Sequence, residues 1–134
     1  SVAAGSTQHL HGHVAYLAQP PWICSGTVRQ AVVQDLPFVE TQYWRTMQAA
    51  QLFPDLAAWE GGDSAFVGGR GLTLSGGQRA RLGLAHVLYR CLVSQVDLVL
   101  LDDCLSAVDV HVAQAIVEET LLGLMLDGRR SVVM

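Results

Sequence analysis

The stretch Leu74-Ser75-Gly76-Gly77-Gln78 decides the fold of this chain, because it opens a helix with a serine and two glycines. One helical face continues from this start in Leu84, Leu88, Cys91 and Leu92. Such a start leaves backbone N–H groups unpaired and unshielded, and the helix dipole points to the same place. The stretch therefore predicts an anion-binding helix start, with an ordinary serine N-cap as the structural alternative.

A nearly continuous apolar run, residues 96–101, follows this helix and ends in Asp102-Asp103. Such a run is typical of a central strand that is buried on both faces. Ligands of open α/β sheets lie beyond the carboxyl ends of the strands, and a carboxylate at that point can hold Mg²⁺ on nucleotide phosphates. Asp102 is the candidate for that role, and Asp103 could then orient an attacking water. The structural alternative is a helix cap or a solvated acid pair after a core strand.

The rest of the chain alternates between predicted strands and helices. Residues 13–18 form an apolar run that Gln19-Pro20-Pro21 closes, which predicts a strand. A short helix is expected over 25–33, and the turn-rich segment 34–69 is expected to be a small helical insert. A second long helix should run from about 110 to 126, capped by Asp109 and stopped by Gly128, before a last strand at 131–134. This order predicts an α/β fold with a mainly parallel sheet.

Composition limits the function classes. The chain has 134 residues, a net charge of −4 and 51% hydrophobic residues, which allows one domain at most and excludes a disordered tail or a nucleic-acid footprint. It shows no signal peptide and no apolar run of the roughly 18–20 residues that cross a bilayer, so this piece is expected to be soluble. Its three widely spaced cysteines are expected to be reduced thiols of a cytosolic protein. All eight basic residues are arginine, so a site that needs a lysine ammonium does not lie in this chain.

Four stretches of the sequence are more specific together than any one of them alone. Gln19, directly after a short strand, could touch a metal ion or a water, although a surface glutamine is the plain interpretation of that residue alone. In this order and spacing, Gln19, residues 74–78, residues 99–102 and residues 106–109 resemble the Q-loop, LSGGQ signature, Walker B strand and D-loop of an ATP-binding cassette (ABC) nucleotide-binding domain. The resemblance covers nearly all of residues 1–134. It implies a P-loop NTPase-like fold with a helical subdomain over about 34–94.

The residues between these motifs resemble the first nucleotide-binding domain of family C, the multidrug-resistance-associated transporters. That family couples ATP to the export of organic anions, drugs, glutathione conjugates and metal–thiol complexes across a membrane. The resemblance rests on stretches such as Pro54-Asp55-Leu56 and Asp102-Asp103-Cys104-Leu105-Ser106. Three residues depart from the family pattern: Gly69 replaces a glutamate, His86 an arginine and Cys104 a proline.

The resemblance also implies roles, partners and cofactors. Two such domains would associate head to tail, and Ser75, Gly76, Gly77, Gln78 and Asp109 would face ATP held by the partner domain. Asp102 and Gln19 would serve the chain's own nucleotide through Mg²⁺, with Gln19 and Asp103 as its catalytic groups. Asp103 stands where an active site of the family carries glutamate, and its carboxylate is one methylene shorter, so this chain's own site is expected to bind ATP but to turn over poorly.

The phosphate-cradling loop G-x-x-x-x-G-K-[ST] needs a lysine and is therefore absent from this chain. The resemblance implies that this loop lies upstream of Ser1 and that the switch histidine lies just past Met134. The fragment is therefore expected to be inactive alone. The complete protein would be integral to a membrane through transmembrane domains, with this domain on the cytoplasmic face.

Other interpretations stay open. A non-transport ABC ATPase of DNA maintenance would carry long coiled coils where residues 34–69 form a short insert without heptads. A channel or regulatory member of family C is not separated from a pump by these residues. His9, His11 and His13 alternate and could share a face as Zn²⁺ or Cu²⁺ ligands, although a polar loop before a strand is favoured. Finally, Trp22, Trp44 and Trp59 are expected to pack the insert or to face transmembrane coupling helices rather than to stack a base.

Overall fold

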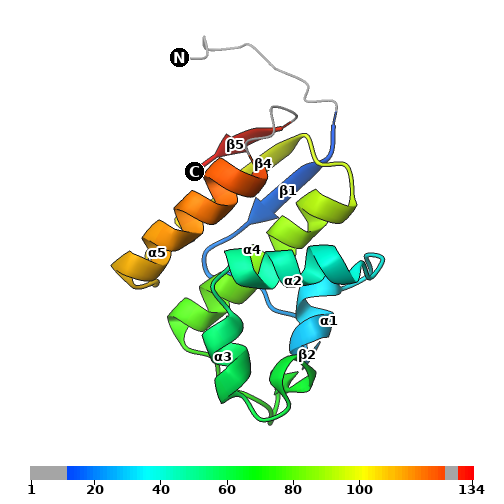
Figure 1. The fold of residues 1–134 in the computed structure, drawn as a ribbon, viewed down its shortest axis with the longest axis vertical. Coiled ribbons are helices and arrows are strands. Elements are labelled where there is room, and N and C mark those ends of the chain that lie inside the picture. Colours follow the sequence, from blue (N-terminus) through cyan, green and yellow to red (C-terminus); the bar gives the residue numbers. More distant parts are fainter. Residues whose placement is uncertain (1–11, 126–129) are drawn as a thin grey trace.

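A three-stranded parallel sheet forms one end of the molecule (Figure 1), in a computed structural model that describes residues 12–125 and 130–134. Its order is β1 (Val14–Leu17), β4 (Leu98–Leu101) and β5 (Ser131–Val133), with β4 in the middle. Both neighbouring pairs run parallel. The mainly parallel α/β architecture expected from the sequence is confirmed at this coarse level.

Helices of this chain cover one face of the sheet. Ala15 and Leu17 of β1 and Val99 and Leu101 of β4 are buried, whereas Tyr16 on the opposite face is 57% exposed. Leu98 and Leu100 on that face are half-buried. The connections from β1 to β4 and from β4 to β5 step in the same direction along the sheet. Because such parallel crossovers are nearly always right-handed, both sets of connecting helices are expected on one side, which explains the asymmetry. The expectation of a strand buried on both faces is therefore wrong for the described part of this chain.

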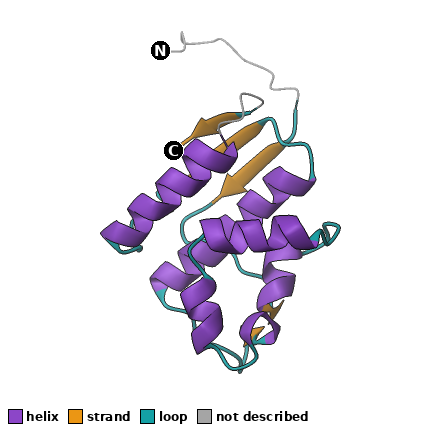
Figure 2. Ribbon diagram, viewed as in Figure 1, coloured by secondary structure: helices purple, strands orange, loops and turns teal. Residues whose placement is uncertain are grey.

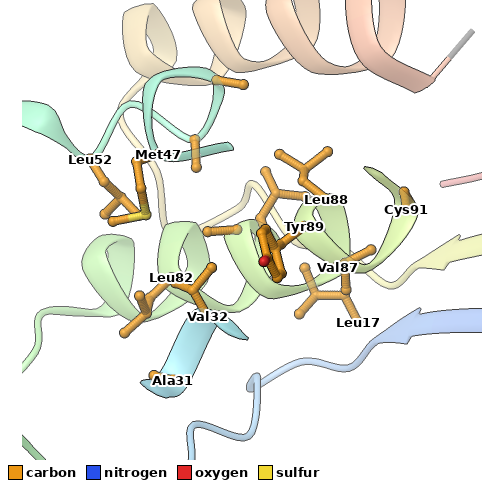
Figure 3. Close-up of a cluster of buried hydrophobic side chains, with 14 of the residues drawn as sticks. Leu17, Ala31, Val32, Met47, Leu52, Leu82, Val87, Leu88, Tyr89 and Cys91 are labelled. Atoms are coloured by element: carbon orange, nitrogen blue, oxygen red, sulfur yellow. The ribbon is translucent and has the colours of Figure 1, made fainter. Parts of the chain in front are cut away.

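The long helix α4 (Gly76–Val93) is the centre of the core. It packs against β1 and against two helices of the preceding segment (Figure 3), and its buried face includes Leu82, Leu88 and Tyr89. Gly83 allows the close approach to β1, since a Cβ at that position would lie 2.7 Å from Cβ of Pro21. The helix thus joins the sheet to the helical part of the molecule.

A lobe of short helices lies at the other end of the molecule (Figures 1 and 2). It contains α1 (Val28–Val33), α2 (Glu40–Ala49), α3 (Phe53–Ala58) and the 3₁₀ helix η1 (Gly62–Ser64). The helical character predicted for residues 34–69 agrees with these elements.

Two details of the lobe differ from expectation. A two-stranded antiparallel ribbon, β2 (Gly26–Thr27) with β3 (Phe66–Val67), closes the lobe. The first helix begins at Val28 rather than near residue 25, because Thr27 caps it and Gln30 completes a capping box.

The second long helix follows β4 as predicted. Asp109 is its N-cap and accepts a 2.9 Å hydrogen bond from the N–H of His111. The segment is an α-helix, α5 (Val110–Ile116), that continues as a π-helix, η2 (Val117–Met125). The predicted stop at Gly128 lies outside the described residues.

Two further features concern the described chain as a whole. Within the described ranges, none of the helices combines the length and the apolar character that crossing a bilayer requires. All three cysteines lie in the described part and none forms a disulfide, which agrees with the expectation of reduced thiols.

Candidate functional site

The carboxyl ends of β1 and β4 meet at one edge of the sheet. Leu17 pairs with Leu101, and the N–H of Asp102 donates a 3.0 Å hydrogen bond to the C=O of Leu17. Gln19 leaves β1 at this edge and Asp102-Asp103 leave β4 beside it. A cavity of about 120 Å³ opens here, and its lining includes Gln19, Gly76, Asp103 and Ser106. The structure thus brings residues from three of the predicted motifs to one place, as expected at the strand ends of an α/β sheet.

Ser106 connects the two strand ends. The Gln19 Nε2 donates a 2.9 Å hydrogen bond to the Ser106 hydroxyl, which in turn donates to the C=O of Asp103 at 3.2 Å. Asp103 has a φ of 47°, in the left-handed region, which aspartate tolerates better than most residues. The tight turn after β4 and the loop after β1 are therefore held together by one serine.

The oxygen donors at this edge fit a magnesium ion that also binds phosphates. Asp102 and Gln19 are exposed and carry carboxylate and amide oxygens, which are ligands that Mg²⁺ accepts. Because Gln19 uses its nitrogen on Ser106, its Oε1 stays available as an acceptor. The described residues contain no cluster of three or more His, Cys, Asp or Glu that could hold a metal alone. Protein Mg²⁺ sites need only one or two carboxylates when phosphates and waters supply the rest, so the two residues suffice for the protein's share.

The start of α4 is an N-cap with spare donors. Ser75 Oγ accepts from the N–H of Gln78 at 3.1 Å, and Gln78 Oε1 accepts from the N–H of Ser75 at 2.9 Å. The first intrahelical bond runs from the N–H of Arg79 to the C=O of Ser75 at 2.9 Å. The N–H groups of Gly76 and Gly77 therefore precede the helical ladder, and the Ser75 hydroxyl keeps its own proton for donation. The serine cap and the anion-binding start that the sequence offered as alternatives are compatible.

The two glycines pack against the loop that follows β4. A Cβ at Gly77 would lie 3.0 Å from the carbonyl oxygen of Ala107, and one at Gly76 would lie 3.5 Å from Cβ of Ala107. That loop ends at Asp109, which uses one carboxylate oxygen to cap α5. The start of α4 and the loop of residues 106–109 thus form one continuous surface.

One residue of this region could not be singled out as functional from the sequence alone. Asp55 of α3 accepts a 3.0 Å hydrogen bond from Gln78 Nε2 and forms an ion pair with Arg81. Its only sequence signal is its place in the Pro54-Asp55-Leu56 stretch, which says nothing of a contact with the start of α4.

The histidines and tryptophans singled out in the sequence meet the expectations only in part. His13 directly precedes β1, and its Nδ1 lies 3.8 Å from Oδ2 of Asp97. His9 and His11 lie outside the described residues, so the shared histidine face stays a prediction. Trp44 and Trp59 pack against the core, as expected for the insert. Trp22 does not, because it is 75% exposed.

Two of the departures from the family pattern have a local structural role. The imidazole Nδ1 of His86 lies 2.8 Å from the C=O of Val32 and ties α4 to α1. Gly69 has a φ of 54°, a conformation that favours glycine over glutamate.

Comparison with known proteins finds curated relatives that all belong to one family. The chain is 44% identical over 124 residues to ABC transporter C family member 13 of Arabidopsis thaliana, which covers 92% of the chain and 8% of that protein. It is 44% identical over 112 residues to metal resistance protein YCF1 of Saccharomyces cerevisiae, covering 84% of the chain and 7% of that protein. It is 39% identical over 127 residues to human ATP-binding cassette sub-family C member 2, covering 90% and 8% respectively. The chain thus spans less than a tenth of these curated relatives, and no family model matches it.

Proposed function

The chain belongs to the C subfamily of ABC transporters, and on that premise we propose that it forms part of the first nucleotide-binding domain of a transporter that couples ATP to export. The observation that carries the proposal is the meeting of three segments around one cavity. Gln19 after β1, Asp103 and Ser106 after β4, and Gly76 at the start of α4 all line it. That convergence is what a site for a phosphorylated ligand requires at a sheet edge.

The start of α4 is proposed to bind ATP that a second nucleotide-binding domain holds, in a head-to-tail pair. Ser75, Gly76 and Gly77 supply a hydroxyl and two unshielded N–H groups, which suit the γ-phosphate. Gln78 fixes the cap from within the first turn. Asp109 ends the adjoining loop and belongs to the same nucleotide-facing surface.

The strand ends are proposed to serve this chain's own nucleotide. Asp102 and Gln19 hold the Mg²⁺, which neutralises phosphate charge when it is bound. Asp103 takes the place of the general base. Its carboxylate is one methylene shorter than the glutamate of active family members, so it aligns the attacking water poorly, and this site binds ATP with slow turnover. Hydrolysis is then concentrated at the site that the second domain builds with Ser75–Gln78 of this chain, and this chain is inactive by itself.

The exported substrate is proposed to be an organic anion, a drug, a glutathione conjugate or a metal–thiol complex. Support comes from relatives whose names describe metal resistance, bile pigment transport and efflux of multiple drugs. The complete protein would be integral to a membrane, with this domain on the cytoplasmic face beside its transmembrane domains. Trp22 and Tyr16, exposed near the loop after β1, are available to face such a partner.

The fold argues against one of the two alternative functions. The segment between β2 and β3 consists of short helices, with no long coiled coil in the described residues, which disfavours an ATPase of DNA maintenance. A channel or regulatory role within the subfamily shares all of the site residues and differs only in what the transmembrane domains do.

Vesicle transport tests the proposal. Inside-out membrane vesicles that contain the complete protein should accumulate a glutathione conjugate only with ATP and Mg²⁺. Ser75→Arg should abolish uptake by filling the γ-phosphate position, whereas Ser75→Thr keeps the hydroxyl cap and should retain it. Full uptake in Ser75→Arg would refute the head-to-tail assignment, and ATP-gated ion conductance without uptake would move the protein to the channel class.

A further inference from the structure

Asp55 lies between two residues of α4 at the point where that helix begins. Its Oδ1 accepts a 3.0 Å hydrogen bond from Gln78 Nε2, and the same oxygen lies 3.3 Å from Nη2 of Arg81. Its Oδ2 pairs with Nη1 of Arg81. Both charged side chains are largely buried, 11% exposed for Asp55 and 14% for Arg81. This is the one described carboxylate that touches a side chain of the 75–78 stretch.

The Asp55 carboxylate sets the orientation of the Gln78 amide. An ionised carboxylate only accepts hydrogen bonds, so the Gln78 amide must turn its nitrogen toward Asp55. Its oxygen then faces the opposite way and accepts the N–H of Ser75 at 2.9 Å. The N–H of Gln78 in turn donates a hydrogen bond to the Ser75 hydroxyl. These hydrogen bonds form one continuous chain from Arg81 through Asp55 and Gln78 to Ser75.

Arg81 keeps Asp55 in place. Its guanidinium forks onto both carboxylate oxygens, and its Nη1 also donates to the C=O of Gln51 at 2.7 Å, just before α3. A partly buried carboxylate needs such a partner, since an unpaired buried charge is costly. The ion pair therefore fixes α3 on α4 and presents the carboxylate to Gln78 in one geometry.

We propose that Asp55 is a positioning residue for the anion-binding start of α4, acting through Gln78 on Ser75. The inference rests on the proposed function, because it assumes that Ser75 contacts ATP. Without the Asp55 acceptor, the Gln78 amide is free to rotate by half a turn, the Ser75 N–H loses its partner, and the hydroxyl and N–H donors of residues 75–77 lose their fixed direction.

The first test is Asp55→Asn in the complete protein, with ATPase rate measured against ATP concentration. Asparagine has the same size, but its amide points a donor either at Gln78 Nε2 or at Arg81, and both of those are donors. The KM for ATP should rise by about two- to tenfold, the factor that one lost hydrogen bond represents. The kcat should change less.

Asp63→Asn is the matched control in the same helical lobe. Asp63 is 14% exposed, pairs with Arg29 at 2.8 Å and accepts the Tyr43 hydroxyl at 3.0 Å. Among the contacts of the described residues it touches nothing in α4. Loss of this carboxylate should leave the KM for ATP unchanged although it also breaks an ion pair of the lobe. An equal KM shift in both variants would overturn the positioning role and leave only a structural one.

A reciprocal exchange separates positioning from packing. In Asp55→Asn/Gln78→Glu, the glutamate accepts from both Ser75 N–H and the asparagine amide, whose oxygen stays free for Arg81. In the Gln78→Glu background, Asp55→Asn should therefore leave the KM unchanged or lower it. A role confined to the Asp55–Arg81 pair predicts the same rise in both backgrounds, and that result would overturn the proposal.

The remaining outcomes are distinguishable. If Asp55→Asn reduces the yield of folded protein, Arg81→Lys loosens the same carboxylate and should raise the KM as well; an unchanged KM there overturns the inference. If the wild-type complete protein hydrolyses no ATP, and Ser75→Arg changes nothing, the proposed function itself fails. A wild-type ATPase sensitive to Ser75→Arg but indifferent to Asp55→Asn contradicts this inference alone.

Discussion

Gln19 and Ser106, which are far apart in sequence, share a 2.9 Å hydrogen bond across the carboxyl ends of β1 and β4. The bond links the loop that leaves the edge strand to the loop that follows the central strand. Ser106 also donates to the C=O of Asp103, so the position of the amide depends on the turn that carries the acidic pair. A substitution that moves one of the two loops should therefore also displace the other.

Ser106→Ala removes both hydrogen bonds and leaves Gln19 without a fixed direction. Because the site is exposed, folding should be little affected, whereas ATP-dependent uptake should fall by about two- to tenfold, the value of one lost hydrogen bond to Gln19. Vesicle uptake at equal protein content checks this. Ser106→Thr, which keeps the hydroxyl, is the control, and equal loss in both variants would contradict the link.

Asp103→Glu should raise hydrolysis at the site that this chain builds with its own nucleotide. The longer side chain brings the carboxylate forward to the water, and the expected gain is on the order of tenfold or more at that site. Glutamate fits the left-handed φ of 47° less well, so a small loss of stability should accompany the gain. The measurement is site-resolved turnover in the complete protein, with Asp103→Asn as the uncharged control. No gain over wild type would remove the explanation for slow turnover.

The two glycines at the start of α4 should respond differently to alanine. Gly77→Ala places a Cβ 3.0 Å from the carbonyl oxygen of Ala107 and should displace the loop after β4, with a clear loss of transport. Gly76→Ala meets only a methyl group at 3.5 Å, an ordinary contact, and alanine favours the helix by about 1 kcal/mol. Uptake should therefore fall more in Gly77→Ala than in Gly76→Ala. The reverse order would show that the loop does not pack on the helix start.

The thiols should differ in their reaction with iodoacetamide. Burial raises the pKa of the Cys104 thiol above its ordinary value, and the neighbouring Asp103 charge raises it further. Since the thiolate is the reacting form, Cys104 should label more slowly than the half-buried Cys24, with a rate that still rises above about pH 9. The raised pKa also means that the folded state favours the neutral thiol. That stabilisation is fully present below the pKa of the unfolded thiol and is lost as the pH rises through the higher pKa of the folded state.

Peptide-level mass spectrometry of the complete protein, labelled natively at several pH values, resolves the two rates. Faster labelling at Cys104 than at Cys24 would show that the turn after β4 opens to solvent.

Local signals in the sequence were sufficient to predict the strands and the helix start around the site. The apolar runs ended by Pro20 and by Asp102 became β1 and β4, and the serine-glycine start became the N-cap of α4. Capping and hydrophobic periodicity are short-range effects, so they can be recognised without knowledge of tertiary contacts. The N-cap role of Asp109 was predicted for the same reason.

Other features depend on contacts between distant residues and have no local signature. The β2–β3 ribbon has two residues in each strand, too few for a period-2 pattern. Asp55 meets Gln78 across 23 positions, and an exposed acid in a short helix looks the same in sequence as one that is paired. A large aromatic side chain such as that of Trp22 is usually expected in a core, yet Trp22 lies exposed in the loop after β1.

Vanadate trapping tests most directly the claim that the start of α4 contacts the γ-phosphate of ATP. The complete protein is trapped with Mg²⁺, ATP and orthovanadate, which takes the place of the γ-phosphate, and ultraviolet light then cuts the backbone where vanadate touches it. If the start of α4 contacts the γ-phosphate, new chain ends should appear at Ser75 or Gly76, and they should be absent without ATP and in Ser75→Arg. Trapped vanadate that cuts elsewhere in the protein but never within residues 75–78 would show that the start of α4 does not contact the γ-phosphate.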